Sequence, residues 1–501
     1  MPALTPRSRP RPLHAALLSL LLMAGAYAEV PRMPVALAVP PSGQLPLSSA
    51  QRAGTEYSDL ARYGYVEEEY YLQGIAPAIT AAGDVLLQAP YTTRILVRKP
   101  ADPARFNGTV VIEPFSWFGE RAAGWILTRD YLLRRGYAYV GYTLNINQPA
   151  VDPKFLSATP AAEAEQIAQY GRIVNFEFMR RFDYARYAPL ASYYDSQRFL
   201  RGDAPDPFAP QSQGIGAQLA LLLKSNSAQG PLAGLSVQRL YVDSWAVTAQ
   251  VWMDYLDQGR HQQWRMPDGK PLIDAYMTGR MAYGEVGGEV LRVPRQLPED
   301  TPFVTVYSQS ELMHDVLEGI ALPADSDRPQ LRYYEVTGMP HLRLADLGTQ
   351  HTEQVAADIG KGDDPQCSTL SDEPVQLVVS ALLDGMDRWV RDGTPMPRAP
   401  RVTREGKAVV RDPLTGNLQG GVRPPWVQVP SATYLTDQES GCGLIYDTKV
   451  PYSRARLRQR YGSFEQYQRA FESAKAISVQ QGYLLPEDAP GLHPIATPQD
   501  F

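Results

Sequence analysis

Apolar residues along this chain recur in short strand-like runs that alternate with longer amphipathic stretches. The strands predicted from the short runs are Thr93–Lys99, Gly108–Glu113, Tyr137–Thr143, Gln238–Asp243, Leu272–Thr278, Thr301–Ser308 and Gln330–Thr337. The helices predicted from the amphipathic stretches are Ala122–Arg135, Gln213–Lys224, Trp245–Asp257, Glu373–Arg391 and Phe464–Gln481. This alternation predicts an α/β fold with a mostly parallel central sheet and helices on both faces.

Two segments break the alternation. Residues 144–208 are rich in Pro, Tyr and Arg, and we predict a lid-like insertion there because long insertions in sheet proteins usually serve binding. From about Ala399 the chain becomes rich in Pro and Gly, and residues 399–501 are predicted to form a C-terminal extension packed on the core. With no internal repeat, residues 29–501 are predicted to form one large domain.

Residues 1–28 have the layout of a secretory signal peptide. Three arginines (Arg7, Arg9 and Arg11) precede the apolar run Ala15–Ala24, which is too short to span a bilayer as an anchor. Ala26-Tyr27-Ala28 follows the small-x-small pattern of a cleavage site. We therefore expect cleavage after Ala28 and export to the periplasm or the medium, without a membrane anchor.

The charge balance excludes two classes of partner. The whole chain has 48 Lys and Arg against 54 Asp and Glu, for a net charge of −6. Without the three arginines of residues 1–28, 45 basic residues face 54 acidic ones, and the net charge is −9. A protein this acidic has no electrostatic footprint for nucleic acid or for an anionic membrane surface.

The cysteines fit an exported protein. Cys367 and Cys442 are the only two, and neither lies near a CxxC motif or a His pair, so no metal site is predicted. In an oxidising compartment the favoured interpretation is a Cys367–Cys442 disulfide that ties the C-terminal segment to the main body. The alternative is two buried free thiols.

Three residues that could carry chemistry come directly after predicted strands. Ser244 follows Gln238–Asp243, Glu311 follows Thr301–Ser308, and His341 follows Gln330–Thr337. The carboxyl ends of parallel strands meet at one edge of a sheet, and Ser, acid, His is the chain order of α/β-hydrolase triads. In such a set His341 would accept the proton of Ser244 while Glu311 holds the imidazole tautomer.

The same hypothesis predicts backbone donors for an oxyanion. One is expected at Trp245, at the start of the helix after Ser244. The second is expected in the loop after Gly108–Glu113, at Phe115, Ser116 or Trp117. No metal ion or organic cofactor is expected.

Other interpretations of these residues stay open. Ser244 could be a helix N-cap, Glu311 a solvated loop acid with His314 and Asp315 as competitors, and His341 a structural histidine. The turn around Ser244 reads Val242-Asp243-Ser244-Trp245-Ala246, whereas a nucleophile turn normally reads G-x-S-x-G because its backbone is crowded. Val242 stands where glycine is usual, and no intact G-x-S-x-G occurs in the chain.

From about residue 35 to the end, the chain resembles the large α/β hydrolase domain proteins. The resemblance is carried by Asn107–Glu113 (NGTVVIE), Leu132–Tyr142 (LLRRGYAYVGY), Pro231–Ser244 (PLAGLSVQRLYVDS), Ser308–Glu311, Gly338–His341, Met386–Pro397 (MDRWVRDGTPMP), Pro451–Tyr461 (PYSRARLRQRY) and Gly482–Pro486 (GYLLP). It implies an α/β-hydrolase fold and a serine hydrolase with Ser244, Glu311 and His341 at the triad positions. The elbow in that family usually reads like G-E-S-Q-S, and this chain departs from it at Val242 and Trp245.

These observations lead to one main hypothesis and two rivals. The main hypothesis is an exported hydrolase that cleaves a small-molecule carboxylic ester through an acyl-serine intermediate, in a pocket walled by residues 144–208 with Trp117, Phe118 and Trp245. The first rival is a ligand-binding protein on a hydrolase scaffold that is catalytically weak or inactive. The second keeps the triad but acts on an amide or lactone. The sequence does not indicate an oligomeric state.

Overall fold

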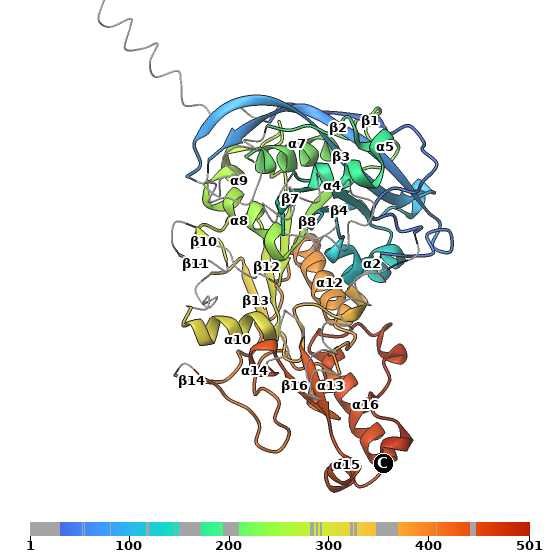
Figure 1. Ribbon diagram of the computed structural model, residues 1–501, viewed down its shortest axis with the longest axis vertical. Helices are drawn as coiled ribbons and strands as arrows, with labels where there is room; N and C mark the ends of the chain where they lie inside the picture. Colours follow the sequence, from blue (N-terminus) through green and yellow to red (C-terminus); the bar gives the residue numbers. More distant parts are fainter. Residues whose placement is uncertain are drawn as a thin grey trace, which may run out of the picture.

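A nine-stranded sheet forms the centre of the protein in a computed structural model (Figure 1). The model describes residues 31–52, 54, 56–80, 82–116, 120–145, 147–149, 172–193, 210–280, 285–286, 289–290, 293–320, 324, 328–346, 369–406, 408–440 and 447–501. Across the sheet the strands are β1 (Val35–Ala38), β2 (Tyr65–Ile79), β3 (Val85–Pro100), β5 (Ala138–Tyr142), β4 (Thr109–Pro114), β8 (Arg239–Trp245), β9 (Ala275–Gly279), β12 (Phe303–Tyr307) and β13 (Leu331–Glu335). All neighbours from β5 to β13 are parallel, while β1, β2, β3 and β5 pair antiparallel. The predicted fold class is confirmed.

Helices cover both faces of the parallel part because its strands are apolar on both sides. On β4, Val111 belongs to one core cluster, while Val110 and Ile112 belong to the other. The first cluster is covered by α2 (Ala123–Arg135) and α12 (Gln376–Asp392). The second is covered by α7 (Ser212–Lys224) and α8 (Ala249–Asp257). Continuous apolar runs of this kind are typical of parallel strands that are buried on both faces.

The antiparallel end of the sheet was not predicted, apart from part of β3. The strands β2 and β3 form a long ribbon that arches over the sheet (Figure 1). The alternation of apolar and polar residues in these strands is hard to recognise in the sequence because charged residues point inward as pairs. Arg98 Nε lies 2.8 Å from Glu67 Oε2, and Arg94 Nη1 lies 3.3 Å from Glu69 Oε1. Both arginines are fully buried. Buried charges of this kind are stable only when paired.

Part of the predicted insertion at 144–208 is described. It contains β6 (Asn147–Pro149), β7 (Arg172–Val174), α4 (Asn175–Phe182) and α5 (Tyr184–Tyr187). Phe176, Met179 and Tyr187 pack with Tyr71 of β2 in a small separate core. The rest of the insertion lies outside the described residues, so its role as a lid stays a prediction.

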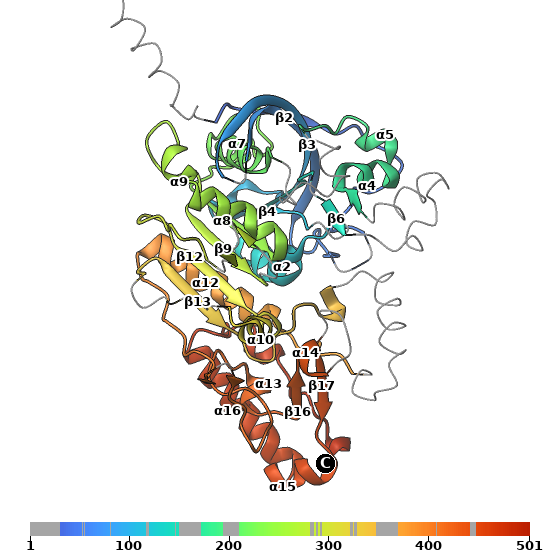
Figure 2. The ribbon, with the colours of Figure 1, turned by 60° about the vertical axis from the view of Figure 1, so that its left-hand side comes forward.

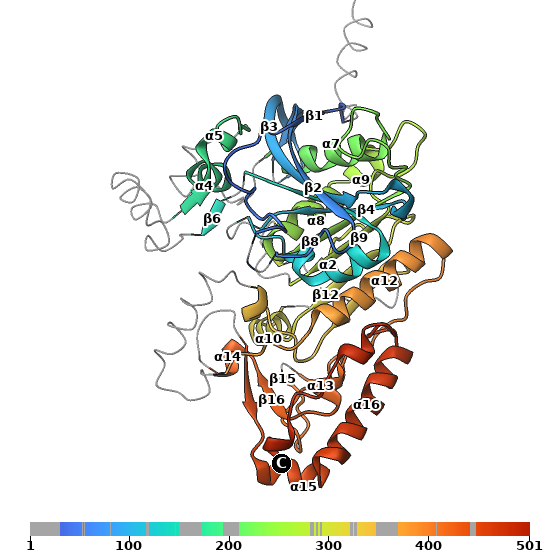
Figure 3. The same ribbon diagram turned by 90° about the vertical axis from the view of Figure 1, so that its right-hand side faces the viewer.

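The C-terminal segment lies at the opposite end of the molecule from β2 and β3 (Figures 2 and 3). Its main elements are α13 (Pro425–Gln428), β16 (Ala432–Leu435), β17 (Thr448–Pro451), α15 (Arg454–Tyr461) and α16 (Phe464–Gln480). Trp426, Tyr434 and Phe471 share one apolar cluster with α2 and α12, so the segment packs on the main core.

Short elements complete the described part. They are α9 (Arg260–Gln263), β10 (Glu285–Val286), β11 (Glu289–Val290), α10 (Gln309–Glu318), β14 (Arg404–Glu405), β15 (Ala408–Val409) and α14 (Asp437–Ser440). The predicted signal peptide (1–28) and both Cys367 and Cys442 lie outside the described residues. Their processing and pairing therefore stay predictions.

Candidate active site

The structure brings Glu311 and His341 together at the carboxyl edge of the sheet. Glu311 lies in the first turn of α10, directly after β12, and His341 follows β13. The turn before His341 begins at Gly338, whose φ of 70° is a left-handed conformation that favours glycine. Three hydrogen bonds tie this loop to α10: His341 N to Ser310 Oγ (3.0 Å), Gln309 N to Met339 O (2.9 Å) and Gly338 N to Gln309 Oε1 (2.8 Å).

Glu311 serves the helix and the histidine at the same time. It forms a capping box with Ser308, in which its carboxylate accepts from the Ser308 backbone N–H and hydroxyl. Its other oxygen accepts a hydrogen bond from His341 Nδ1. Burial alone would raise the pKa of Glu311, but the charge of His341 and the hydrogen bonds from His341 and Ser308 hold it below its ordinary value. Glu311 is therefore an ionised carboxylate at neutral pH.

An ionised Glu311 fixes the chemistry of the imidazole ring. The carboxylate accepts a proton-bearing Nδ1, so the neutral ring carries its basic lone pair on Nε2. Among the described residues, no hydrogen-bond partner lies on Nε2. A buried carboxylate thus orients His341, and the geometry leaves Nε2 able to accept a proton.

The sharp bend after β8 lies at Ala246, two residues beyond Ser244. Ser244 and Trp245 are still part of β8, where they pair with Thr278 and Gly279 of β9. A 3-10 turn, Ala246–Thr248, then leads into α8, so the helix begins later than the predicted Trp245. Ala246 has a φ of 54°, which few residues with a side chain adopt. This is the strained strand-to-helix apex at which α/β hydrolases place their nucleophile.

Centring the turn on Ala246 removes the difficulty with Val242. The pentapeptide around the apex is Ser244-Trp245-Ala246-Val247-Thr248, in which the small Ser244 stands two positions before the apex and the β-branched Thr248 two positions after it. Ser244 occupies the place of the first glycine and not of the nucleophile. Its Oγ lies 3.4 Å from Thr248 Oγ1, and the side chain is fully buried. The structure shows no hydrogen bond between Ser244 and His341 among the described residues.

Two of the backbone N–H groups predicted as oxyanion donors form hydrogen bonds within the protein. The Ser116 N–H donates to Arg121 O at 2.8 Å and the Phe115 N–H donates to Tyr142 O at 2.8 Å. These two donors are therefore already used inside the protein. Trp245 lies within β8 rather than in the first turn of a helix, and Trp117 lies outside the described residues. With the apex at Ala246, the first-turn N–H that follows it belongs to Val247.

A pair of buried carboxyl groups beneath this edge was not predicted. Glu113 accepts from the N–H groups of Gly124 (2.7 Å) and Trp125 (2.9 Å) at the start of α2, and from Tyr139 Oη (2.7 Å). Asp243 accepts from the Trp245 indole at 2.5 Å. Burial and the neighbouring Asp243 raise the pKa of Glu113 to about 8, and burial raises that of Asp243 to about 7. The pair therefore holds a proton near neutral pH. The two carboxyl groups titrate as a coupled pair, so the proton belongs to the pair rather than to one member.

Unusual backbone conformations gather at the same edge. Within the described part, five non-glycine residues have a positive φ, and three of them lie here: Glu120 (57°), Ala246 and Arg280 (49°). Arg280 follows β9 directly, is buried, and pairs with Asp346 at 2.9 Å. Burial also raises the pKa of Glu120 to about 7. Strain and buried charge of this kind cluster at functional sites.

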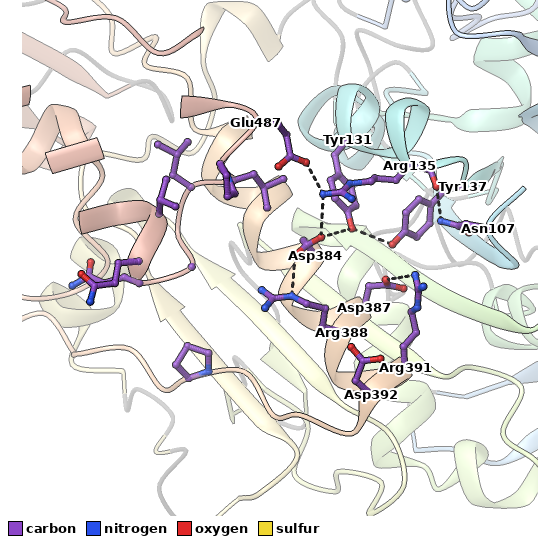
Figure 4. A pocket seen from close by; sticks show the side chains of 18 residues that line it. Asn107, Tyr131, Arg135, Tyr137, Asp384, Asp387, Arg388, Arg391, Asp392 and Glu487 are labelled. Carbon is purple, nitrogen blue, oxygen red and sulfur yellow. Dashed lines mark hydrogen bonds and ion pairs between the residues drawn. The ribbon is translucent and has the colours of Figure 1, made fainter. Parts of the chain in front are cut away.

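A hollow lies at the other end of the sheet, next to Asn107 and Tyr137, which precede β4 and β5 (Figure 4). It has a volume of about 830 Å³ and is bounded by α2, α12 and the residues that follow α16. Its charged side chains pair with one another: Arg135 with Glu487 (2.6 Å) and Arg388 with Asp384 (3.0 Å). No histidine, serine or cysteine is among the described residues that line it.

The fold, with an acid after β12 and a histidine after β13, defines an α/β-hydrolase. The Alpha/beta hydrolase domain family model matches residues 37–493, and the chain belongs to this family. This confirms the resemblance described above. No helix in the described part of the chain has the length and apolar character needed to cross a membrane.

Comparisons with individual proteins give only distant likenesses. No curated protein matches the chain in sequence. Similar solved structures include the esterase LipW from Mycobacterium marinum (10% identity, 56% of this chain, 74% of that chain, TM-score 0.26). Others are the esterase Est22 (10% identity, 58% and 77% coverage, TM-score 0.30) and a bacterial heroin esterase (10%, 60% and 84%, TM-score 0.27). Identities and scores this low carry no argument about activity.

Proposed function

We propose that the protein hydrolyses a small-molecule carboxylic ester at the carboxyl edge of the sheet, with Glu311 and His341 as its acid–base pair. The observation that carries the proposal is the hydrogen bond between the Glu311 carboxylate and His341 Nδ1. A buried, ionised carboxylate that orients an imidazole with a free Nε2 is the arrangement that acyl hydrolysis requires. The same chemistry extends to lactones and amides, and a substrate panel separates these classes.

A panel of p-nitrophenyl esters with short acyl chains tests this proposal. Wild type should release p-nitrophenol faster than His341→Ala, because only wild type has the general base. Arg388→Ala is the matched control, since Arg388 lines the hollow at the opposite end of the sheet. Equal rates for wild type and His341→Ala across the panel would remove the proposal.

The second candidate is binding of the same class of compound without turnover. It is favoured by one observation: the apex residue Ala246 has no hydroxyl. Quenching of tryptophan fluorescence by N-(4-nitrophenyl)acetamide, under conditions in which no 4-nitroaniline is released, measures such binding. Saturable quenching together with no His341-dependent turnover would favour this candidate over the first.

Export and the disulfide are also part of the proposed function. We propose that the mature protein begins at Glu29 and that Cys367 and Cys442 are joined. The support is the layout of residues 1–28 and the presence of only two cysteines. N-terminal sequencing of exported protein should begin at Glu29. Thiol titration of the unfolded, non-reduced protein should detect no free thiol, and two thiols would rule out the bridge.

A further inference from the structure

We propose that the nucleophile at this site is a water molecule beside Ala246, activated by His341, and not the hydroxyl of Ser244. The inference rests on the proposed ester hydrolysis and specifies how it proceeds. It starts from the apex: Ala246 has a φ of 54° at the end of β8 and is partly exposed, whereas Ser244 is fully buried. The apex is thus open to solvent and carries a methyl group where a nucleophilic side chain would stand.

Ser244 is held away from the apex by the strand that contains it. It pairs with Thr278 of β9, and alternate strand residues share a face, so its side chain lies on the side of Val242. Val242 belongs to the core cluster that contains α7 and α8. The Ser244 hydroxyl faces this cluster and reaches only Thr248 Oγ1.

Three described hydroxyls, two beside the pair and one two residues after the apex, are already engaged. Ser308 Oγ bonds to Glu311, and Ser310 Oγ donates to Asp447 Oδ1 at 2.7 Å. Thr248 Oγ1 donates to Trp245 O at 2.9 Å. These hydroxyls therefore have no proton to spare for a general base.

Two further threonines lie inside the sheet rather than at its edge. Thr278 of β9 and Thr305 of β12 are register partners, and both are fully buried. Their hydroxyls have no partner, but residues paired in register share a face, so both lie on the buried side with Ser244. With these described hydroxyls engaged or turned away, water is the oxygen nucleophile that we assign to the partly exposed apex.

The reaction then balances without a covalent intermediate. The water oxygen bonds to the ester carbonyl carbon while His341 Nε2 takes one water proton. The tetrahedral oxyanion collapses, the bond between the carbonyl carbon and the leaving oxygen breaks, and the imidazolium returns its proton to that oxygen. One ester and one water give one acid and one alcohol, and His341 is neutral again. General-base catalysis of this kind contributes roughly 10²–10⁴-fold, so the enzyme is slow.

Fluorophosphonate labelling followed by intact mass measurement tests the inference in wild type, Ser244→Ala, Ala246→Ser and the double variant Ala246→Ser/His341→Ala. We expect no label on wild type, unchanged ester hydrolysis in Ser244→Ala, and about one equivalent of label on Ala246→Ser. The double variant should not label, because the new serine needs His341. Ser244→Gly gives a second test if Ser244→Ala does not fold, because glycine also fits this position.

The contrary outcomes are distinct from failure of the proposed function. If wild type turns over esters with His341 and also labels, and Ser244→Ala abolishes both, the water mechanism falls while ester hydrolysis stands. If folded Ala246→Ser does not label, Ala246 is not the nucleophile position and the inference falls. If no His341-dependent turnover exists in wild type, the proposed hydrolysis fails and the water mechanism fails with it.

Discussion

The two ends of the parallel sheet differ in how their charges are held. At the carboxyl edge, ionisable groups are buried and the backbone is strained: Glu311 pairs with His341, and Ala246 and Arg280 both have positive φ. At the amino end, the hollow of about 830 Å³ is lined by α2, α12 and the residues that follow α16, and its charged side chains pair with one another. Judged by volume alone, the hollow would be the candidate functional site. Backbone strain and buried charge instead indicate the carboxyl edge as the functional site, because both features cluster at such sites.

The largest effect should come from Glu311→Gln. The neutral amide introduced there cannot stabilise the imidazolium and can present its N–H to Nδ1, which favours the wrong tautomer of His341. We expect the kcat for p-nitrophenyl acetate to fall on the order of 10²–10⁴-fold, measured together with circular dichroism. Glu318→Gln, near the end of the same helix, is the control. A Glu311→Gln rate within twofold of wild type would contradict the role of the pair.

A second large effect concerns the pair of carboxyl groups beneath the edge. The folded pair keeps a proton up to its raised pKa values of about 7 and 8, whereas the unfolded chain releases it near pH 4. The stabilisation is therefore fully present below about pH 4 and is lost as the pH rises to the folded pKa values of about 7 and 8.

Asp243→Asn should reduce this pH dependence. The amide keeps the acceptor for the Trp245 indole and does not titrate. Between pH 5 and 9, the free energy of unfolding from urea denaturation should fall by about 1–3 kcal/mol less in Asp243→Asn than in wild type. Parallel pH profiles for the two proteins would show that Asp243 does not titrate in this range with a raised pKa.

The smallest effect should come from the amino end. Arg388 is 60% exposed and pairs with Asp384 four residues earlier in α12. Exposed pairs of this type contribute little, so Arg388→Ala should change the free energy of unfolding by about 0.2–1 kcal/mol and leave ester hydrolysis unchanged. Loss of hydrolysis in Arg388→Ala would show that the amino end of the sheet also takes part in the reaction.

The sequence was sufficient to predict the parallel part of the fold because its strands are continuous apolar runs. It was not sufficient for β2, since Glu67 and Glu69 point inward and are neutralised by arginines from β3, a pairing that only the folded sheet creates. The helix α10 also has a readable signal in the sequence, the S-x-x-E capping box of Ser308 and Glu311.

The candidate site was predictable in part for similar reasons. Glu311 and His341 were found because each follows a predicted strand, and parallel strands end at one edge. The position of the bend was missed because a φ of 54° at an alanine leaves no mark in the sequence. The serine two residues earlier was the more conspicuous choice. Val242 stands where a turn centred on Ser244 would normally have glycine, and this was the sequence signal against Ser244 as the apex. With the apex at Ala246, Val242 no longer occupies that position.

The most direct test of the central claim is the pre-steady-state time course of p-nitrophenol release from p-nitrophenyl acetate by wild type at high enzyme concentration. An acyl-serine intermediate would appear as a burst, whereas general-base attack by water releases product at one steady rate. We predict a linear course without a burst, at a rate that His341→Ala lowers to the uncatalysed level. A burst of about one equivalent per protein molecule that disappears in Ser244→Ala would contradict this account.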